Sequence, residues 1–473
     1  MTELTTLKFV SERTKQQVFA NDAGACAAAV HEVSRIDPTL SQIVAGLLEP
    51  NQNTRMTPET VDQDDLTHAL IPSSSSLSPS EREEASLPSL SSVEAMLSMI
   101  KCNWGIGMIA MPLYLQKSGS FAGLIFFLLT MILTFESIKK MYRAKSEKTK
   151  TYSDVVELRL GYSCKILSMI CIAASTYGSA IAYVQFVADT LSDFDGINPI
   201  YSVPILALFV SFSCFFDRLD ALAKFSGIGL LFSVSFGMMI VGRSFFKTSS
   251  QSISDFRAEF FDIRWDSFPS ATGLAVFCNE GIVVMSVQVA KDMKRSQDFL
   301  YAAAISVTLF TFAYMSVAFS GSVQYYGKVK DEITQNLLND LDIPGRILPN
   351  LYCIQVVLTF PIVLWMAYSQ YEQLHCFAQQ PRKTRIAVRI LSVILVCIIA
   401  ATLRGFGDIL ALTGSAANSI SIYILPNLCY YVSVGKHASF FDRVCIVLFL
   451  LFGVATGILG TVQSAKDLID RNT

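Results

Sequence analysis

Charged residues are scarce in this 473-residue chain: Asp, Glu, Lys and Arg make up 16% of it, against 52% apolar residues. A soluble globular protein carries roughly 25% charged residues, so the composition excludes a soluble globular domain for most of the chain. The two signs nearly cancel, giving a net charge of -2. Because no basic tract with interleaved aromatic residues occurs, we expect no nucleic-acid partner.

Catalytic and metal-binding motifs are also missing from the sequence. Its eleven cysteines include no Cys-x-x-Cys pair and form no Cys/His cluster with the spacing of metal ligands. Ten of them lie in or beside apolar segments, where cysteine acts as a small hydrophobic residue. No nucleophile–base pair is evident, so we predict neither an enzyme nor a cofactor. The chain also starts without an apolar signal segment, so the first membrane helix would direct insertion.

What the chain does contain is a series of apolar segments of about 18–25 residues, each long enough to cross a ~30 Å hydrocarbon core as a helix. Alternating strands are absent, and a bilayer then admits only helices. The segments are 93–114, 121–141, 164–190, 200–216, 225–246, 269–290, 299–324, 348–370, 386–404, 408–432 and 440–462. The sequence therefore predicts an all-α membrane protein with about eleven transmembrane helices in the lipid bilayer.

The two ends of the chain are predicted to lie outside the bilayer. Residues 1–90 end in a stretch rich in Ser, Pro and Glu, which cannot bury a core, so we expect a largely disordered cytoplasmic tail. Residues 91–463 would form the transmembrane domain, and residues 464–473 a short C-terminal tail. Within the domain, the helices divide into a first repeat over 93–246, a second over 269–432 and an extra helix over 440–462.

Basic residues mark the cytoplasmic side, because Lys and Arg concentrate in cytoplasmic loops. The loop after the second helix is rich in them, whereas 189–199 holds no Lys or Arg and three Asp. The N-terminus is therefore predicted inside, and eleven crossings place the C-terminus outside or in an organelle lumen. Four basic residues before Pro269 are the exception to the rule: Arg243, Lys247, Arg257 and Arg264.

Two helices are interrupted at mid-depth by glycine and polar residues. The first segment contains Asn103-Trp-Gly-Ile-Gly107, and the sixth, five helices later, contains Phe277-Cys-Asn-Glu-Gly281. Interruptions at matching places in two five-helix halves are typical of inverted-repeat transporters. The N-termini of the half-helices offer N–H groups to a carboxylate, and freed carbonyls can hold a cation or an ammonium group. An amino acid carries both charges.

These residues also resemble a known family. Lys101-Cys-Asn-Trp-Gly-Ile-Gly-Met108, with Met111-Pro112, is similar to the first-helix motif of the amino acid/auxin permease family, closest to its proton-coupled amino acid transporter branch. Further matches follow in order over roughly residues 91–460: Tyr152–Glu157, Gly178, Tyr183, Phe186, Phe277, Glu280–Ile282, Lys291–Lys294, Leu412–Ser415 and Pro426. The resemblance implies a LeuT-type fold of five plus five helices with an added eleventh, discontinuous in helices 1 and 6.

The sequence departs from the animal branch of that family at three places. Ser98 stands where the animal branch has a histidine. The animal branch joins two outer loops by a disulfide, but the matching loops here hold no cysteine. The Pro and Glu that follow the sixth-helix motif in that branch are replaced here around Ser286–Gln288. Both the coupling ion and the range of substrates are therefore left open.

The resemblance assigns roles to individual residues. Backbone N–H groups would hold the substrate carboxylate at Gly105, Ile106 and Gly107, and walls and carbonyls would be supplied by Phe277, Cys278 and Asn279. Tyr183 would face the substrate from the third helix. Sodium, if it is the coupling ion, would bind at Asn103 and Thr359. Thr359 has an alternative, because a membrane-helix threonine commonly bonds to its own helix.

Glu280 is the candidate for proton coupling. A charged carboxylate near mid-membrane costs roughly 2.5–3.5 kcal/mol, so this group is suited to gain and lose a proton during transport. The alternative is a glutamate that braces the broken helix.

The predicted function is secondary active transport of small or neutral amino acids coupled to protons. Two alternatives stay open: sodium coupling, and an amino-acid sensor that signals through the N-terminal tail. The membrane would be the plasma membrane or that of a vacuole or lysosome. The sequence names neither the amino acid nor any protein partner.

Overall fold

The computed structural model describes residues 90–195, 220–340, 342–374, 379–434 and 439–473, and also residues 203, 204, 207, 211, 214 and 377. This part of the chain is helical, and its one β contact is an isolated bridge between Leu90 and Met293. Nine helical runs within it are long and apolar enough to cross a membrane. The all-α membrane fold is therefore confirmed. Residues 1–89 and most of 200–216 lie outside the described residues.

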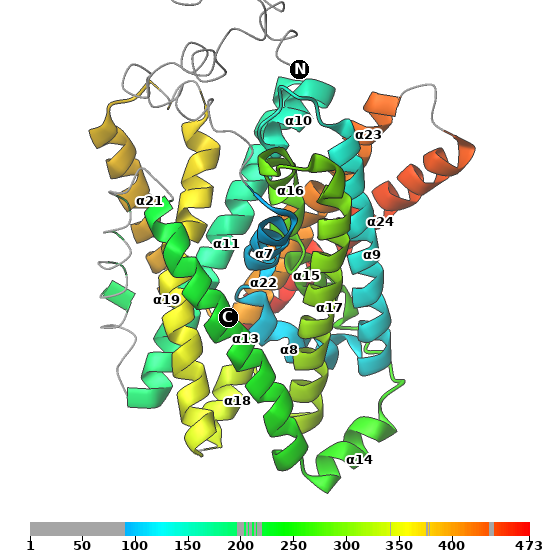
Figure 1. The fold of residues 1–473 in the computed structure, drawn as a ribbon. Coiled ribbons are helices and arrows are strands. Elements are labelled where there is room, and N and C mark those ends of the chain that lie inside the picture. Colours follow the sequence, from blue (N-terminus) through cyan, green and yellow to red (C-terminus); the bar gives the residue numbers. More distant parts are fainter. Residues whose placement is uncertain are drawn as a thin grey trace, which may run out of the picture. The chain divides into compact units, whose positions relative to one another are not determined.

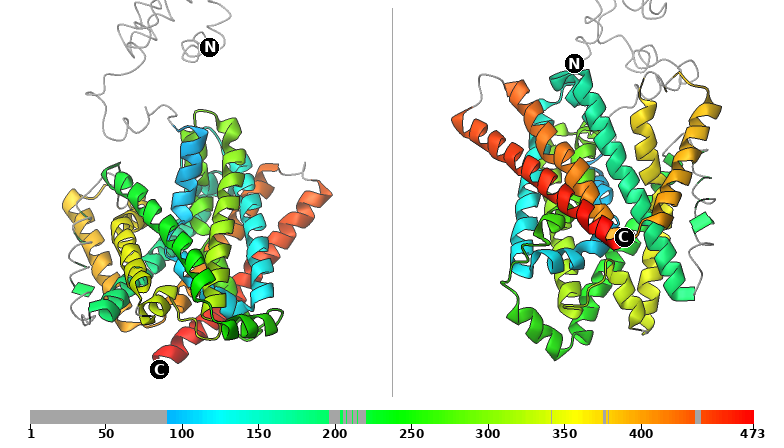
Figure 2. Two further views of the ribbon diagram at one scale, coloured as in Figure 1. Left: turned by 60° about the horizontal axis from the view of Figure 1, so that its bottom comes forward. Right: turned by 180° about the vertical axis from the view of Figure 1, so that it is seen from behind.

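The long helices follow the predicted apolar segments. They are α9 (Ser120–Ala144), α11 (Tyr162–Asp195), α13 (Asp220–Lys247), α17 (Phe299–Gln324), α19 (Ile343–Glu372), α21 (Arg382–Thr402) and α24 (Phe440–Asn472). Three short helices connect them: α10 (Tyr152–Leu160), α14 (Ser250–Ala258) and α18 (Ile333–Asn339). α10 lies at one end of the bundle, and α14 and α18 lie at the other (Figure 1). α24 ends on the side of α14 (Figure 2).

Both predicted interruptions are present. The first segment is split into α7 (Ser92–Asn103) and α8 (Gly107–Ser118), and the sixth into α15 (Phe268–Phe277) and α16 (Glu280–Asp292). The start of α7 is tied to the end of α16, because the Leu90 N–H donates to the Asp292 carbonyl at 2.9 Å. The four half-helices lie in the centre of the bundle (Figure 1).

The tenth apolar segment is distorted in a way that hydropathy does not reveal. It consists of α22 (Phe406–Thr413), two π-helical stretches, η3 (Gly414–Asn418) and η4 (Ile420–Ile424), and α23 (Leu425–Val434). π-Helical turns are rare and occur frequently at functional sites. α22 and η3 pack closely on α15, since a Cβ added to Gly273 would collide with the Ala411 carbonyl oxygen of α22, and one added to Gly414 of η3 would collide with the Gly273 carbonyl oxygen. These glycines bring the tenth helix against the broken sixth helix.

The last helix is longer than the predicted segment 440–462, because α24 continues to Asn472. Charged and polar residues begin after Val462, which is where an apolar stretch ends. They do not end the helix, since Asp467, Arg471 and Asn472 all bond to neighbouring parts of the protein. Hydropathy shows where the apolar part of a helix ends, but the helix itself can continue beyond that point.

Arg243, one of the exceptions to the charge rule, does not lie in a loop. It is buried within α13, 7% exposed, and its guanidinium group is 2.6 Å from Asp342 Oδ1 and 2.5 Å from Asp340 Oδ2. Because both carboxylates neutralise Arg243, this residue says little about which side of the membrane the following loop faces.

Candidate functional site

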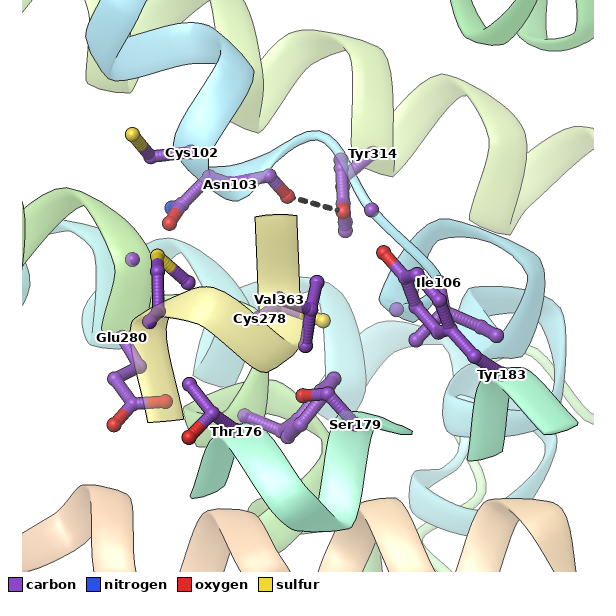
Figure 3. A pocket seen from close by; sticks show the side chains of 15 residues that line it. Cys102, Asn103, Ile106, Thr176, Ser179, Tyr183, Cys278, Glu280, Tyr314 and Val363 are labelled. Atoms are coloured by element: carbon purple, nitrogen blue, oxygen red, sulfur yellow. Dashed lines mark hydrogen bonds between the residues drawn. The ribbon is translucent and has the colours of Figure 1, made fainter. Parts of the chain in front are cut away.

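A cavity of about 90 Å³ lies where the two interrupted helices meet (Figure 3). The first break and its flanks contribute Cys102, Asn103, Gly105, Ile106 and Gly107, and the second contributes Phe277, Cys278, Glu280 and Gly281. The remaining lining residues are Thr176, Ser179 and Tyr183 of α11, Tyr314 of α17, and Val363 and Met366 of α19. The fold thus brings together most of the residues that the sequence singled out.

The first break leaves α8 without a side-chain cap, so the N–H groups of its first turn are not bonded by a capping side chain. Close approach to this backbone depends on glycine. A Cβ on Gly107 would lie 2.8 Å from Cys278 Sγ, and one on Gly105 would lie 3.3 Å from the Tyr183 hydroxyl oxygen. An uncapped helix N-terminus beside a cavity is a binding site for a carboxylate.

Two tyrosines fix the carbonyl groups of this break. The Tyr314 hydroxyl donates to the Asn103 carbonyl oxygen, and the Tyr352 hydroxyl donates to the Gly105 carbonyl oxygen, both at 2.8 Å. The predicted role of freed carbonyls as cation ligands is thereby weakened, because each already accepts a hydrogen bond. The tyrosines hold the extended backbone in place instead.

Asn103 joins the two breaks. Its side-chain oxygen accepts a hydrogen bond from the Ile282 N–H at 2.7 Å, so it caps α16 from another helix. The backbones approach closely here, because a Cβ on Gly281 would collide with the Cys102 carbonyl oxygen. The side-chain nitrogen of Asn103, a residue only 7% exposed, has no partner among the described residues. This nitrogen is a donor left available beside the cavity.

Glu280 is the one charged side chain among the described residues that line the cavity. Its Oε2 atom accepts a short hydrogen bond from the Ser175 hydroxyl of α11. Its Oε1 atom is buried and makes no hydrogen bond within the described part of the chain, and the Asn418 side chain lies near the carboxyl group. A carboxyl group with one oxygen bonded and one free can carry a proton on the free oxygen.

Two predicted residues do not line the cavity. The Asn279 amide donates to the Ala275 carbonyl oxygen at 2.9 Å and the residue is fully buried, so it stabilises the end of α15. The Thr359 hydroxyl donates to the Gln355 carbonyl oxygen of its own helix at 3.0 Å. The sequence had left this arrangement open as the alternative to a sodium ligand.

Several lining residues were not predicted. Ser175, Ser179 and Tyr183 follow one another at intervals of four residues on α11, and Thr176 lies directly after Ser175, so a polar stripe on this helix was the available signal. Tyr314, Val363 and Met366 lie on long apolar helices with no local mark in the sequence. They reach the cavity only through the packing of α17 and α19 around the breaks.

The fold is shared with a known membrane carrier. A Na⁺-coupled sialic acid symporter, solved in a substrate-bound outward-open state, superposes with a TM-score of 0.55 over 80% of this chain and 90% of its own, at 12% sequence identity. At that identity the likeness concerns the fold alone. Together with the two broken helices around a central cavity, it defines the chain as a multi-pass membrane protein of LeuT-type fold.

The chain belongs to the transmembrane amino acid transporter protein family, whose model matches residues 88–466. The resemblance found in its motifs is thereby confirmed. Amino acid transporter AVT1J of Arabidopsis thaliana is 25% identical over 390 residues, 78% of this chain and 89% of the relative. Amino acid transporter ANT1 of the same plant is 22% identical over 408 residues, 79% and 92% of the two chains.

Proposed function

We propose that this protein is a symporter that carries small neutral amino acids across a membrane together with protons. The observation that carries the proposal is the pairing, in one small cavity, of an uncapped helix N-terminus with a glutamate that has one free oxygen. A family of amino acid transporters supplies the substrate class.

The volume and charge of the cavity support the substrate class. About 90 Å³ gives room for several water-sized groups, which suits a short side chain better than a long one. The described lining contains no Lys or Arg to neutralise an acidic side chain. The substrate carboxylate would bind at the first turn of α8, and the Asn103 side-chain nitrogen can donate to it.

Charge explains why a proton would accompany the substrate. Two carboxylates in one cavity repel each other, strongly so where water is largely excluded. Protonation of Glu280 removes this repulsion, so proton and amino acid bind best together. Ser175 orients Oε2, which leaves Oε1 to take up and release the proton.

Sodium coupling finds less support. Of its two predicted ligands, Asn103 directs its oxygen to the Ile282 N–H and Thr359 directs its hydroxyl to its own helix. The sensor alternative depends on residues 1–89, which the structure does not describe. We keep the predicted orientation, with the basic loop before α10 in the cytoplasm, as part of the proposal.

Uptake into proteoliposomes tests the function. The purified protein should accumulate a radiolabelled small neutral amino acid, such as alanine, when the outside is made acidic, and should do so without sodium. A sodium gradient at constant pH should drive no accumulation. Accumulation that requires sodium would overturn the choice of ion, and the absence of both uptake and exchange across all twenty amino acids would overturn the transport proposal.

A further inference from the structure

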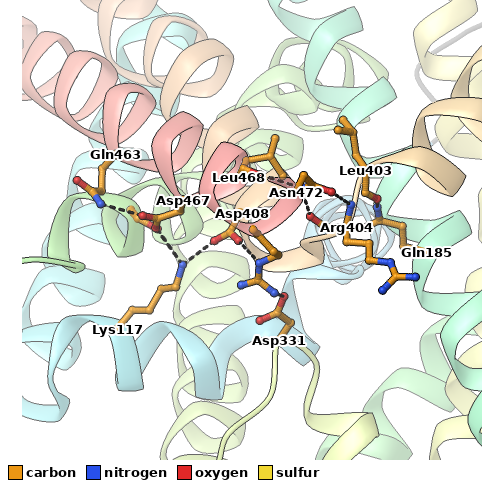
Figure 4. Close-up of polar contacts among 12 residues, drawn as sticks. Lys117, Gln185, Asp331, Leu403, Arg404, Asp408, Gln463, Asp467, Leu468 and Asn472 are labelled. Carbon is orange, nitrogen blue, oxygen red and sulfur yellow. Dashed lines mark hydrogen bonds and ion pairs between the residues drawn. The ribbon is translucent and has the colours of Figure 1, made fainter.

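A cluster of ion pairs lies away from the cavity, beside the start of α18 (Figure 4). Lys117 Nζ of α8 is 2.7 Å from Asp408 Oδ1 and 3.4 Å from Asp467 Oδ2. Arg471 contacts Asp408 Oδ2 at 2.9 Å and Asp331 Oδ2 at 2.5 Å. The Asp408 side chain is 1% exposed, so a buried carboxylate is held between two cations.

On one side of this cluster, α24 is fixed to the tenth helix along much of its length. Gly453, Gly457 and Gly460 face residues 415–424, which include η4 and most of η3, so closely that a Cβ at each would lie within about 3.0 Å of a side chain there. Small residues permit this contact between membrane helices. At the last turn, the Asn472 side chain bonds the Arg404 backbone twice, N–H and carbonyl, at 2.8 Å each. α24 is therefore joined to the chain on both sides of α22: to the π-helical stretches after it and to Arg404 before it.

On the other side, the cluster holds the half-helices that form the site. Lys117 is on α8, which begins at the cavity, and it also donates to the Ser270 hydroxyl of α15 at 3.1 Å. Asp331 precedes α18. Any movement of α8 away from α22 separates Lys117 from Asp408 and Asp467 at once. The buried Asp408 carboxylate would then keep only one of its two cationic partners, Arg471, which is unfavourable.

We propose that the last turns of α24, through Asp467 and Arg471, form a latch that keeps this end of the path to the cavity closed. Asp467 contacts Lys117, and Arg471 contacts Asp408, so the latch supports both members of the Lys117–Asp408 pair. Because both latch residues lie on α24, a helix outside the two five-helix repeats takes part in closing the path. Release of the latch favours the state in which the cavity opens beside α18. The latch acts only if the cavity opens beside α18 during transport, and its action does not depend on which compound is carried.

Thiol labelling of the full-length protein tests the latch. Cys278 lines the cavity, so its reaction with a membrane-impermeant maleimide, followed by peptide mass spectrometry, reports access without interference from other cysteines. Lys328→Cys, at an exposed position in the loop before α18, identifies the correct side of the membrane. The reagent is added on the side from which this cysteine is labelled. In the double variant Asp467→Asn/Arg471→Gln, we expect Cys278 to react about tenfold faster, which corresponds to a loss of about 1.4 kcal/mol in the stability of the closed state.

A matched control separates the latch from a general change of charge. Lys466→Gln/Asp470→Asn makes the same exchange on the same turns at exposed positions, and it should leave the labelling rate of Cys278 unchanged. Arg471→Lys keeps the charge and should stay near the wild-type rate. A folded Asp467→Asn/Arg471→Gln protein labelled at the wild-type rate would overturn the proposal.

A second variant covers the case in which the double variant does not fold. Asp467→Asn alone removes the charge from the 3.4 Å contact to Lys117 and keeps an oxygen that can accept the Gln463 hydrogen bond. It should raise the rate by a smaller factor, and a wild-type rate there would also overturn the latch. Because labelling is measured without substrate, a failure of amino acid uptake would leave this result standing.

Discussion

The cavity and the latch both place carboxylates among polar groups inside the protein, but they treat those groups differently. At the latch, Asp408 of α22 contacts two cations, Lys117 and Arg471, each of which has a further acidic partner. At the cavity, Glu280 Oε1 and the Asn103 side-chain nitrogen are left without partners among the described residues. Complete pairing stabilises one arrangement of the helices. Incomplete pairing at the cavity marks groups that are available to a ligand or a proton.

The largest effect should come from removing the charge of Glu280. Glu280→Gln keeps the shape and the Ser175 contact but cannot carry the transported proton, so acid-driven accumulation of substrate should be lost while exchange of substrate across the membrane survives. The two modes are measured side by side in proteoliposomes. Glu136→Gln, a half-exposed glutamate paired with Lys139, serves as the control and should retain both. Full acid-driven accumulation by Glu280→Gln would show that Glu280 is a brace.

Next in size is the close contact between the two breaks. Gly281→Ala places a methyl group against the Cys102 carbonyl oxygen and 2.8 Å from Asn103 Oδ1, so we expect a loss of about 1–3 kcal/mol in the free energy of unfolding. Gly242→Ala is the matched helix control, since its Cβ meets nothing within 4 Å; it should be neutral or stabilising. Thermal unfolding in detergent compares the two. Equal melting temperatures would contradict the packing at the breaks.

Asn103→Ala should have an effect on stability of similar size. It leaves the Ile282 N–H without an acceptor, which costs about 1–3 kcal/mol for a buried donor. Asn350→Ala provides the comparison, because that amide bonds only to its own helix and is more exposed. The same unfolding assay applies, and a melting temperature for Asn103→Ala no lower than for Asn350→Ala would argue against the cap.

The smallest effect is expected at Thr359. Thr359→Val removes a hydroxyl that bonds to its own helix and keeps the methyl group that faces Gly229. The free energy of unfolding should therefore change by less than about 1 kcal/mol. Acid-driven uptake should be retained. Sodium-dependent uptake that Thr359→Val abolishes would instead restore the sodium-ligand role.

Much of this organisation was predictable from the sequence, because lipid imposes a simple rule on composition. Apolar length predicted the helices, and glycine with polar residues at mid-depth predicted both breaks. The direction of individual side chains was not predictable. Asn279 and Asn103 look alike in the sequence, yet one bonds back to α15 and the other crosses to α16. Which of them faces the cavity depends on the path of the backbone after each half-helix ends.

The latch was missed for a related reason. Lys117, Asp408 and Asp467 lie about 60 to 350 residues apart along the chain, and each alone resembles an ordinary charge at the end of a membrane helix. Sequence periodicity within one helix carries no information about which helix ends meet. The same limit concealed Tyr314 and Tyr352, which hold the first break from two other helices.

Ligand binding at Gly107 tests the central claim most directly. A bound ligand at about 100 times its Kd stabilises a protein by about 2.7 kcal/mol, so a small neutral amino acid should raise the melting temperature of the wild-type protein. Gly107→Val fills the space beside Cys278 and Phe277 and should abolish that rise, whereas Gly242→Val should retain it. A wild-type rise in folded Gly107→Val protein would contradict the placement of the amino acid at the broken helices.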